Sequence, residues 1–202
     1  MPATAQPLQQ TASLNLADLE VGDIIATSAD TKNSRTIRWA TNSPYSHAIL
    51  YDGYGYGIEA LPGPGVVKRP IYLSIADTGS CKVFRHKFAD TVARDRAVSW
   101  AALQIGRSYD YTGAARVGLQ SGSRTRVFHY TTLGFLISLQ DVRSANRSDS
   151  GHDETFFCSE LIARAYEVAG APIVNRPAAI TGPGHFLVTD RLTVVGWLNA
   201  KS

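Results

Sequence analysis

Short apolar segments separated by glycine- and proline-rich turns fill residues 21–85, with almost no helical pattern between them. Gly53–Gly57 and Pro62–Gly65 have the composition of hairpin turns. Strands joined by such short turns pair antiparallel. The pattern therefore predicts an antiparallel meander built from five strands: Val21–Thr27, Tyr45–Asp52, Ile58–Leu61, Val66–Leu73 and Cys81–Arg85.

Helical patterns surround these strands. Apolar residues recur at helical spacing over Asp90–Ile105 and over Glu154–Ala169, and each pattern stops at a glycine. Weaker patterns predict a lead-in turn over Leu14–Glu20, a modest helix over Thr31–Thr41, and terminal strands or edge elements at Phe186–Thr189 and Leu192–Trp197. The expected fold class is α+β, with the antiparallel sheet packed against a helix that contains Cys158.

The length of 202 residues suits one domain. We expect a flexible tail over residues 1–13, a single domain over 14–202, and an insertion at about 112–153, where the periodic pattern loosens. Twenty basic and seventeen acidic residues leave a net charge of +3 without any dense Lys/Arg run. Nucleic acid is therefore not an expected partner.

Two cysteines and five scattered histidines show no metal-ligand spacing, so we expect neither a metal nor another cofactor. The first ten residues lack the basic start and apolar core of a Sec signal peptide. No apolar run approaches the roughly 18–20 residues that span a bilayer, so no transmembrane segment is expected. These features predict a soluble protein, either cytoplasmic or exported by a signal-independent route.

Cys158 falls in the first turn of its predicted helix. Unpaired N–H groups and the positive end of the helix dipole favour the thiolate there, and the thiolate is the nucleophilic form. The alternative is that Cys158 is a small buried apolar residue, as most unpaired cysteines are, and this is the better interpretation of Cys81.

A cysteine nucleophile needs a histidine base and a group that orients it. His47 begins a strand after a Pro-Tyr-Ser turn and is the best candidate base, with Glu59 as the candidate orienting group. A hairpin centred near Gly55 places His47 opposite a residue near position 63, and a bulged loop brings Glu59 within diagonal reach. The alternative is that His47 is a strand-end histidine hydrogen-bonded to the backbone and that Glu59 is a solvated strand residue. His185 is the rival base, because it follows the cysteine in the sequence, as the base does in papain.

Five motifs occur in a characteristic order: Gly22-Asp-Ile-Ile, Ser46-His-Ala-Ile-Leu-Tyr, Ile58-Glu-Ala, Gly106-Arg-Ser-Tyr-Asp and Phe157-Cys-Ser-Glu-Leu-Ile. Together they resemble the circularly permuted, papain-like cysteine hydrolases of the NlpC peptidase superfamily. Within that superfamily they are most similar to the YiiX/YebB-like group, which is related to the lecithin:retinol acyltransferases. The resemblance covers residues 21 to about 170.

The resemblance implies roles for individual residues. Cys158 would be the nucleophile, His47 the general base and acid, and Glu59 the third, orienting residue. The backbone N–H of Cys158 would be the main oxyanion donor. The resemblance also implies a set of oxyanion and substrate-cleft residues: Tyr45, Ser46, Tyr109 and Ser159.

The function expected from the resemblance is hydrolysis of an amide bond, in a peptide or amide substrate derived from the cell wall, such as a peptidoglycan stem peptide. Such an enzyme could be a recycling enzyme or a secreted antibacterial effector with an immunity or adaptor protein. One alternative is a lipid acyl-ester hydrolase or acyltransferase, suggested by the apolar stretch Tyr130–Leu139; another is a non-catalytic binding module. The long segment between Tyr109 and Cys158 departs from compact members of the superfamily and could form a lid or a wall of the site.

Overall fold

The computed structural model of the protein describes residues 12–29, 34–35, 38, 43–114, 117 and 155–198. Within them the chain forms a seven-stranded sheet in the order β1-β7-β6-β2-β3-β4-β5. Neighbouring strands pair antiparallel except β1 and β7, which are parallel. The strands are β1 (Ala12–Leu14), β2 (Ile24–Ala29), β3 (His47–Gly53), β4 (Tyr56–Leu61), β5 (Gly65–Pro70), β6 (Thr78–His86) and β7 (Leu192–Leu198). The predicted α+β class with a mainly antiparallel sheet is confirmed.

The meander prediction holds for β2 to β5 and fails for β6. The β3–β4 turn consists of Tyr54 and Gly55, whose φ angles of 51° and 81° suit a type I′ hairpin. β5 ends at Pro70 rather than continuing to Leu73, because proline has no N–H to donate to a strand ladder. The short helix α2 (Ile71–Ile75) follows. β6 then pairs with β2, along the edge of β2 that does not pair with β3, instead of extending the meander beyond β5.

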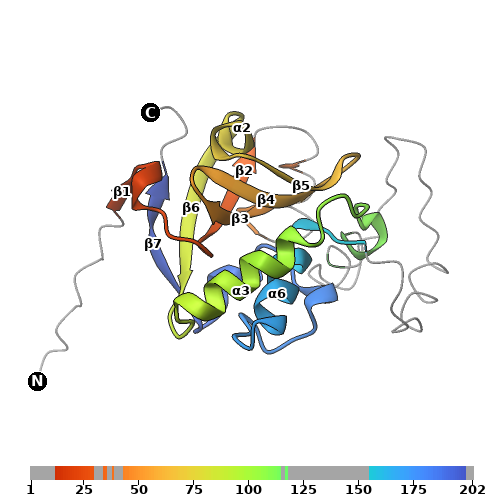
Figure 1. Cartoon of the computed structure of the whole chain (residues 1–202). Coiled ribbons are helices and arrows are strands. Elements are labelled where there is room, and N and C mark those ends of the chain that lie inside the picture. The colour runs from red at the N-terminus through yellow and green to blue at the C-terminus, as the bar shows by residue number, and fades with distance from the viewer. Residues whose placement is uncertain are drawn as a thin grey trace, which may run out of the picture.

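Helices α3 (Thr91–Ala102) and α6 (Cys158–Val168) pack against each other and against the sheet (Figure 1). The Asp90 carboxylate caps α3 by accepting a hydrogen bond from the Ala93 N–H at 2.8 Å. Both helices lie within the ranges predicted from the sequence. Figure 1 shows the two helices lying along one side of the strands, whereas α2 lies on the other side.

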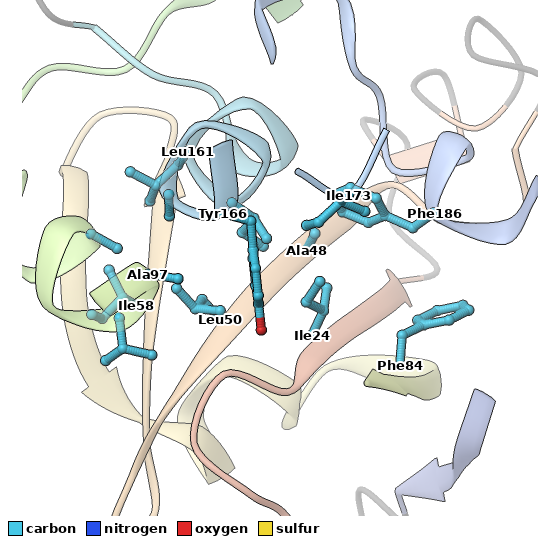
Figure 2. Close-up of a cluster of buried hydrophobic side chains, with 14 of the residues drawn as sticks. Ile24, Ala48, Leu50, Ile58, Phe84, Ala97, Leu161, Tyr166, Ile173 and Phe186 are labelled. Carbon is cyan, nitrogen blue, oxygen red and sulfur yellow. The ribbon is translucent and has the colours of Figure 1, made fainter. Parts of the chain in front are cut away.

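Two apolar clusters lie on opposite faces of the sheet because neighbouring strand residues point to opposite sides. Ile24 and Leu50 belong to the cluster beneath α3 and α6, whereas Ile25 and Ile49 belong to the cluster that includes Ile71 of α2. Figure 2 shows the first cluster, in which α6 contributes Leu161 and Tyr166. Full burial of each large apolar side chain stabilises the fold by about 1.5–3 kcal/mol. α6 is therefore packed firmly against the sheet.

The chain ends differ from the predictions in two places. Phe186–Thr189 is not a strand, because α7 (His185–Val188) occupies it. The terminal strand predicted at Leu192–Trp197 is confirmed as β7, which lies between β6 and β1. β1 begins at Ala12, inside the predicted tail. Two short 3₁₀ helices complete the described elements, η1 (Leu16–Asp18) in the predicted lead-in turn and η3 (Ala178–Ile180).

Some predictions fall on residues outside the described ranges. Only residues 34, 35 and 38 of the predicted helix Thr31–Thr41 are described, and all three are helical. The insertion at 112–153 lies outside them except for residues 112–114 and 117, and Tyr130–Leu139 lies wholly outside. Among the helices that the structure describes, none combines the length and the apolar character needed to cross a membrane.

Candidate active site

The first residue of α6 is Cys158, so the cysteine occupies the first helical turn as predicted. The segment that leads into it is held by pairing with residues 108–110. The Phe156 N–H donates to the Ser108 carbonyl at 3.1 Å, and the Asp110 N–H donates to the Phe156 carbonyl at 3.0 Å. This bridge fixes the backbone two residues before the thiol.

The remainder of α6 is anchored in the core. Leu161, Ile162 and Tyr166 are fully buried. The Tyr166 hydroxyl donates to the Gly22 carbonyl at 2.5 Å and so ties the helix to the start of β2. The position of Cys158 is therefore set from both sides.

The Cys158 thiol meets the sheet where β3 and β4 separate. The β3–β4 ladder ends at the pair Leu50–Ile58, before the first residues of β3 are reached. There the sulfur lies near the backbone N–H groups of Ala48 and Ser159. Burial alone would raise the pKa of the Cys158 thiol, but the charge and hydrogen bond of His47 and these two N–H groups lower it. The site favours the thiolate.

His47 lies between the thiol and a carboxylate. Its Nε2 is 2.5 Å from Oε2 of Glu59, which leaves Nδ1 as the ring nitrogen for Cys158. Burial would lower the pKa of His47, but the charge and hydrogen bond of Cys158 and those of Glu59 raise it to about 10. A raised imidazole pKa beside a lowered thiol pKa favours a thiolate–imidazolium pair.

The register of β3 and β4 explains this contact. A bulge interrupts the ladder between Tyr51 and Gly53. Continuing the register beyond the Leu50–Ile58 pair sets His47 level with Leu61. Glu59 is then a diagonal neighbour on the same face, as the sequence predicted for a bulged hairpin.

Glu59 is fully buried and has two further partners that sequence reasoning missed. Its Oε1 accepts hydrogen bonds from Arg69 Nε and from Ser74 Oγ, each at 2.5 Å. Burial would raise the pKa of the Glu59 carboxyl, but His47, Ser74 and Arg69 lower it to about 2. The carboxylate therefore stays ionised.

Comparison with known proteins identifies the fold through structure and not through sequence. No protein-family model matches the chain, and neither does any curated protein. Among solved structures it is similar to the metalloprotein YiiX from Escherichia coli O157:H7, a DUF1105 protein, with a TM-score of 0.59 and 19% sequence identity. The chain has a YiiX-like fold. The similarity covers 88% of this chain and 96% of that chain.

The predicted cleft residues lie at different depths in the structure. Tyr45 is buried in the core cluster beneath α6, and the Ser46 hydroxyl lies 2.6 Å from that of Ser34. Tyr109 forms the bridge with Phe156, and its ring packs edge-on against Tyr111. These positions put Tyr109 beside the entry to α6; its contact with substrate stays a prediction, as do those of Tyr45 and Ser46.

Ser159 has two separate connections to the site. Its backbone N–H lowers the pKa of the Cys158 thiol. Its hydroxyl is fully buried and has no hydrogen-bond partner among the described residues. The side chain therefore belongs to the interior, and the backbone is the part of Ser159 that serves the site.

Two further histidines within the described residues have other surroundings. His185 Nδ1 accepts from the Gly182 N–H at 2.8 Å, and its Nε2 is 2.6 Å from Arg176. His86 Nδ1 accepts from the backbone N–H groups of Phe88 and Ala89. Among the described histidines, His47 is the one that interacts with the Cys158 thiol, so the described structure does not support His185 as the base.

YiiX is described as a metalloprotein, which raises the question of whether this chain could hold a metal ion. The part of the chain that the structure describes contains no group of three or more His, Cys, Asp or Glu side chains suited to one. At Glu59 both oxygens already accept hydrogen bonds from His47, Arg69 and Ser74. The described residues therefore do not fit a resident metal.

Proposed function

We propose that the protein is a thiol hydrolase that cleaves amide bonds, built on a circularly permuted papain-like version of the YiiX-like fold. Cys158 is the nucleophile, His47 the general acid and base, and Glu59 the orienting carboxylate. The observation that carries the proposal is the unbroken interaction chain from the thiol through His47 to a buried carboxylate. Such a chain supplies the activated nucleophile, the base and the third group that this chemistry needs.

The reaction follows from the protonation states. The thiolate of Cys158 attacks the carbonyl carbon of the amide, and the carbonyl oxygen becomes an oxyanion. The backbone N–H of Cys158 has no intrahelical partner, because it lies at the first position of α6, and it can donate to that oxygen. The His47 imidazolium gives its proton to the leaving amine as the C–N bond breaks, which leaves a thioester on Cys158.

The second half of the reaction restores the enzyme. Neutral His47 takes a proton from water, whose oxygen attacks the thioester carbonyl. The sulfur leaves as thiolate and the acid is released. Throughout, Glu59 holds the Nε2 side of the ring, so that Nδ1 stays directed at the sulfur.

The substrate class we propose is the amide bond of peptidoglycan stem peptides. The support is the resemblance of the sequence motifs to the NlpC superfamily, for which these peptides are the commonest substrates. Delivered to the cell wall of a competitor, such an activity would make the protein an antibacterial effector.

The test is digestion of purified peptidoglycan followed by mass analysis of the released fragments. Wild-type protein is expected to create new amine ends, and Cys158→Ala is expected to create none. Liposomes are tested in parallel. Release of acyl chains without new amine ends would contradict amide hydrolysis and support the lipid ester alternative.

A substrate-independent measurement accompanies the digestion. The alkylation rate of Cys158 by iodoacetamide is followed against pH, with peptide-level mass analysis to separate it from Cys81. Cys81 is an internal reference, because burial raises the pKa of its thiol. A Cys158 midpoint near the ordinary value of about 8.5 would indicate a binding module and not a hydrolase.

A further inference from the structure

Arg69 and Ser74 lie behind Glu59, on the side away from the thiol. We propose that both are positioning residues for the reaction, and that the fixed charge of Arg69 completes an alternating row of charges that keeps Cys158 in its thiolate form. This inference rests on the proposed function, since it assigns a role within the same site.

The first support is that the two oxygens of the Glu59 carboxylate have different partners. Oε1 of Glu59 is held by Arg69 Nε and Ser74 Oγ at 2.5 Å each, and Oε2 is 2.5 Å from His47. The two holding groups also contact each other, with Arg69 Nε 3.1 Å from Ser74 Oγ. A carboxylate fixed through one oxygen presents the other in a single direction, so the imidazole ring is oriented in turn.

The second support is the way the fold assembles this contact. Glu59 pairs with Val67 in the β4–β5 ladder, which makes Arg69 a diagonal neighbour on the same face. β5 then ends at Pro70, and the one-and-a-half turns of α2 bring Ser74 back over Glu59. Two separate elements thus converge on one buried oxygen.

The third support is the balance of charge. The row runs from cationic Arg69 through anionic Glu59 and cationic His47 to anionic Cys158, so its sum is zero. Without Arg69, two buried anions would face one cation. Burying an uncompensated charge is costly, and removal of a fixed cation favours protonation of the groups near it. Loss of Arg69 should therefore make the thiolate harder to form.

Two other charged groups on the described parts of these elements have partners of their own. Lys68 points to the opposite face of β5, where it pairs with Asp52 and lies over the Tyr56 ring. On α6, the Glu160 carboxylate accepts a hydrogen bond from the Phe157 N–H at 3.4 Å. Lys68 therefore offers a matched control, a cation one residue away on the same strand but outside the row.

The experiment compares the pH midpoint of Cys158 alkylation in wild type, Arg69→Gln, Arg69→Lys, Ser74→Ala and Lys68→Gln. Arg69→Gln is expected to raise the midpoint by about 0.5–1 pH unit. Arg69→Lys, which keeps the charge, should stay close to wild type, and Lys68→Gln should not change. Ser74→Ala should raise the midpoint by a smaller amount, because it removes one neutral hydrogen bond from Glu59.

The outcomes separate this inference from the proposed function. An ordinary thiol midpoint in wild type would overturn the proposed function itself. A low wild-type midpoint that Arg69→Gln leaves unchanged would overturn the role of Arg69 alone. Circular dichroism and urea unfolding establish whether each variant is folded. If Arg69→Gln does not fold, Ser74→Ala becomes the deciding variant. An unchanged alkylation midpoint in Ser74→Ala would then overturn the inference.

Discussion

Asp23 and Glu59 are both fully buried carboxylates paired with an arginine, but their remaining partners differ in kind. Arg85 grips both oxygens of Asp23 at 2.7 Å, and the Glu20 N–H donates to the same carboxylate at 2.8 Å. In Glu59, only Oε1 accepts a hydrogen bond from the arginine, Arg69. Oε2 lies against the imidazole of His47, which can lose its proton.

The surroundings continue this contrast. Arg85 and Arg94 both pair with the Glu20 carboxylate at 2.5 Å, which joins the start of β2 to β6 and α3. That cluster consists of carboxylates and guanidinium groups, and it holds these elements together. The comparison teaches that a buried carboxylate acquires a chemical role when one of its partners titrates and a nucleophile lies beyond that partner.

Replacing Glu59 by Gln should have the largest effect on chemistry. The amide keeps the shape of the side chain but loses the negative charge that raises the pKa of His47. We expect hydrolysis to fall by about 10²–10⁴-fold, as for the loss of an orienting carboxylate in other triads. The measurement is the rate of amine release at saturating enzyme, and retention of more than a tenth of the wild-type rate would contradict the orienting role.

Replacing Asp23 by Asn should affect stability instead. Arg85 would keep its charge with fewer partners, and loss of one member of a buried pair costs several kcal/mol. Because about a quarter of the Arg85 side chain is exposed, we expect a loss of about 2–4 kcal/mol in urea unfolding. The pH midpoint of Cys158 alkylation in the folded variant should match wild type. A shifted midpoint would contradict the distinction between a structural cluster at Asp23 and a chemical one at Glu59.

Much of this contrast could be predicted from local sequence. The turns at Gly53–Gly57 and Pro62–Gly65 determine the hairpins, and the diagonal contact of His47 with Glu59 follows from a bulged register. β1 could not be predicted, because three residues are too short for a periodic signal and its stability depends on pairing with β7.

The partners of Glu59 required more than a local pattern. Arg69 could have been found by centring the second hairpin on Gly63, which pairs Glu59 with Val67 and makes Arg69 a diagonal neighbour. Ser74 could not, because the apolar pattern through Leu73 predicted a strand where Pro70 in fact ends it. The Asp23–Arg85 pair was missed because β6 returns to β2, a long-range pairing that strand patterns do not encode.

Acid should weaken the Glu59 cluster in a defined pH range. A carboxyl whose folded pKa is lowered to about 2 contributes stability above its unfolded value of 4.5 and loses it as pH falls towards 2. Over that range the unfolding free energy should fall by on the order of 1 kcal/mol per pH unit from this group alone. Urea unfolding at pH 7 and pH 3 should therefore show a smaller acid loss in Glu59→Gln than in wild type, and parallel curves would contradict the assignment.

Replacing Tyr166 by Phe should have the smallest effect and gives the sharpest test of independence. The change leaves the buried Gly22 carbonyl without the hydroxyl that now donates to it at 2.5 Å, and such a loss costs about 1–2 kcal/mol. Tyr166 lies about two helical turns from Cys158 on the same helix. Any structural coupling between the Asp23 cluster and the Glu59 cluster would therefore run through α6. An unchanged alkylation midpoint beside a small drop in urea stability would show that α6 anchors the thiol without tuning it, whereas a midpoint that moves with this mutation would mean that the structural cluster sets the chemistry as well.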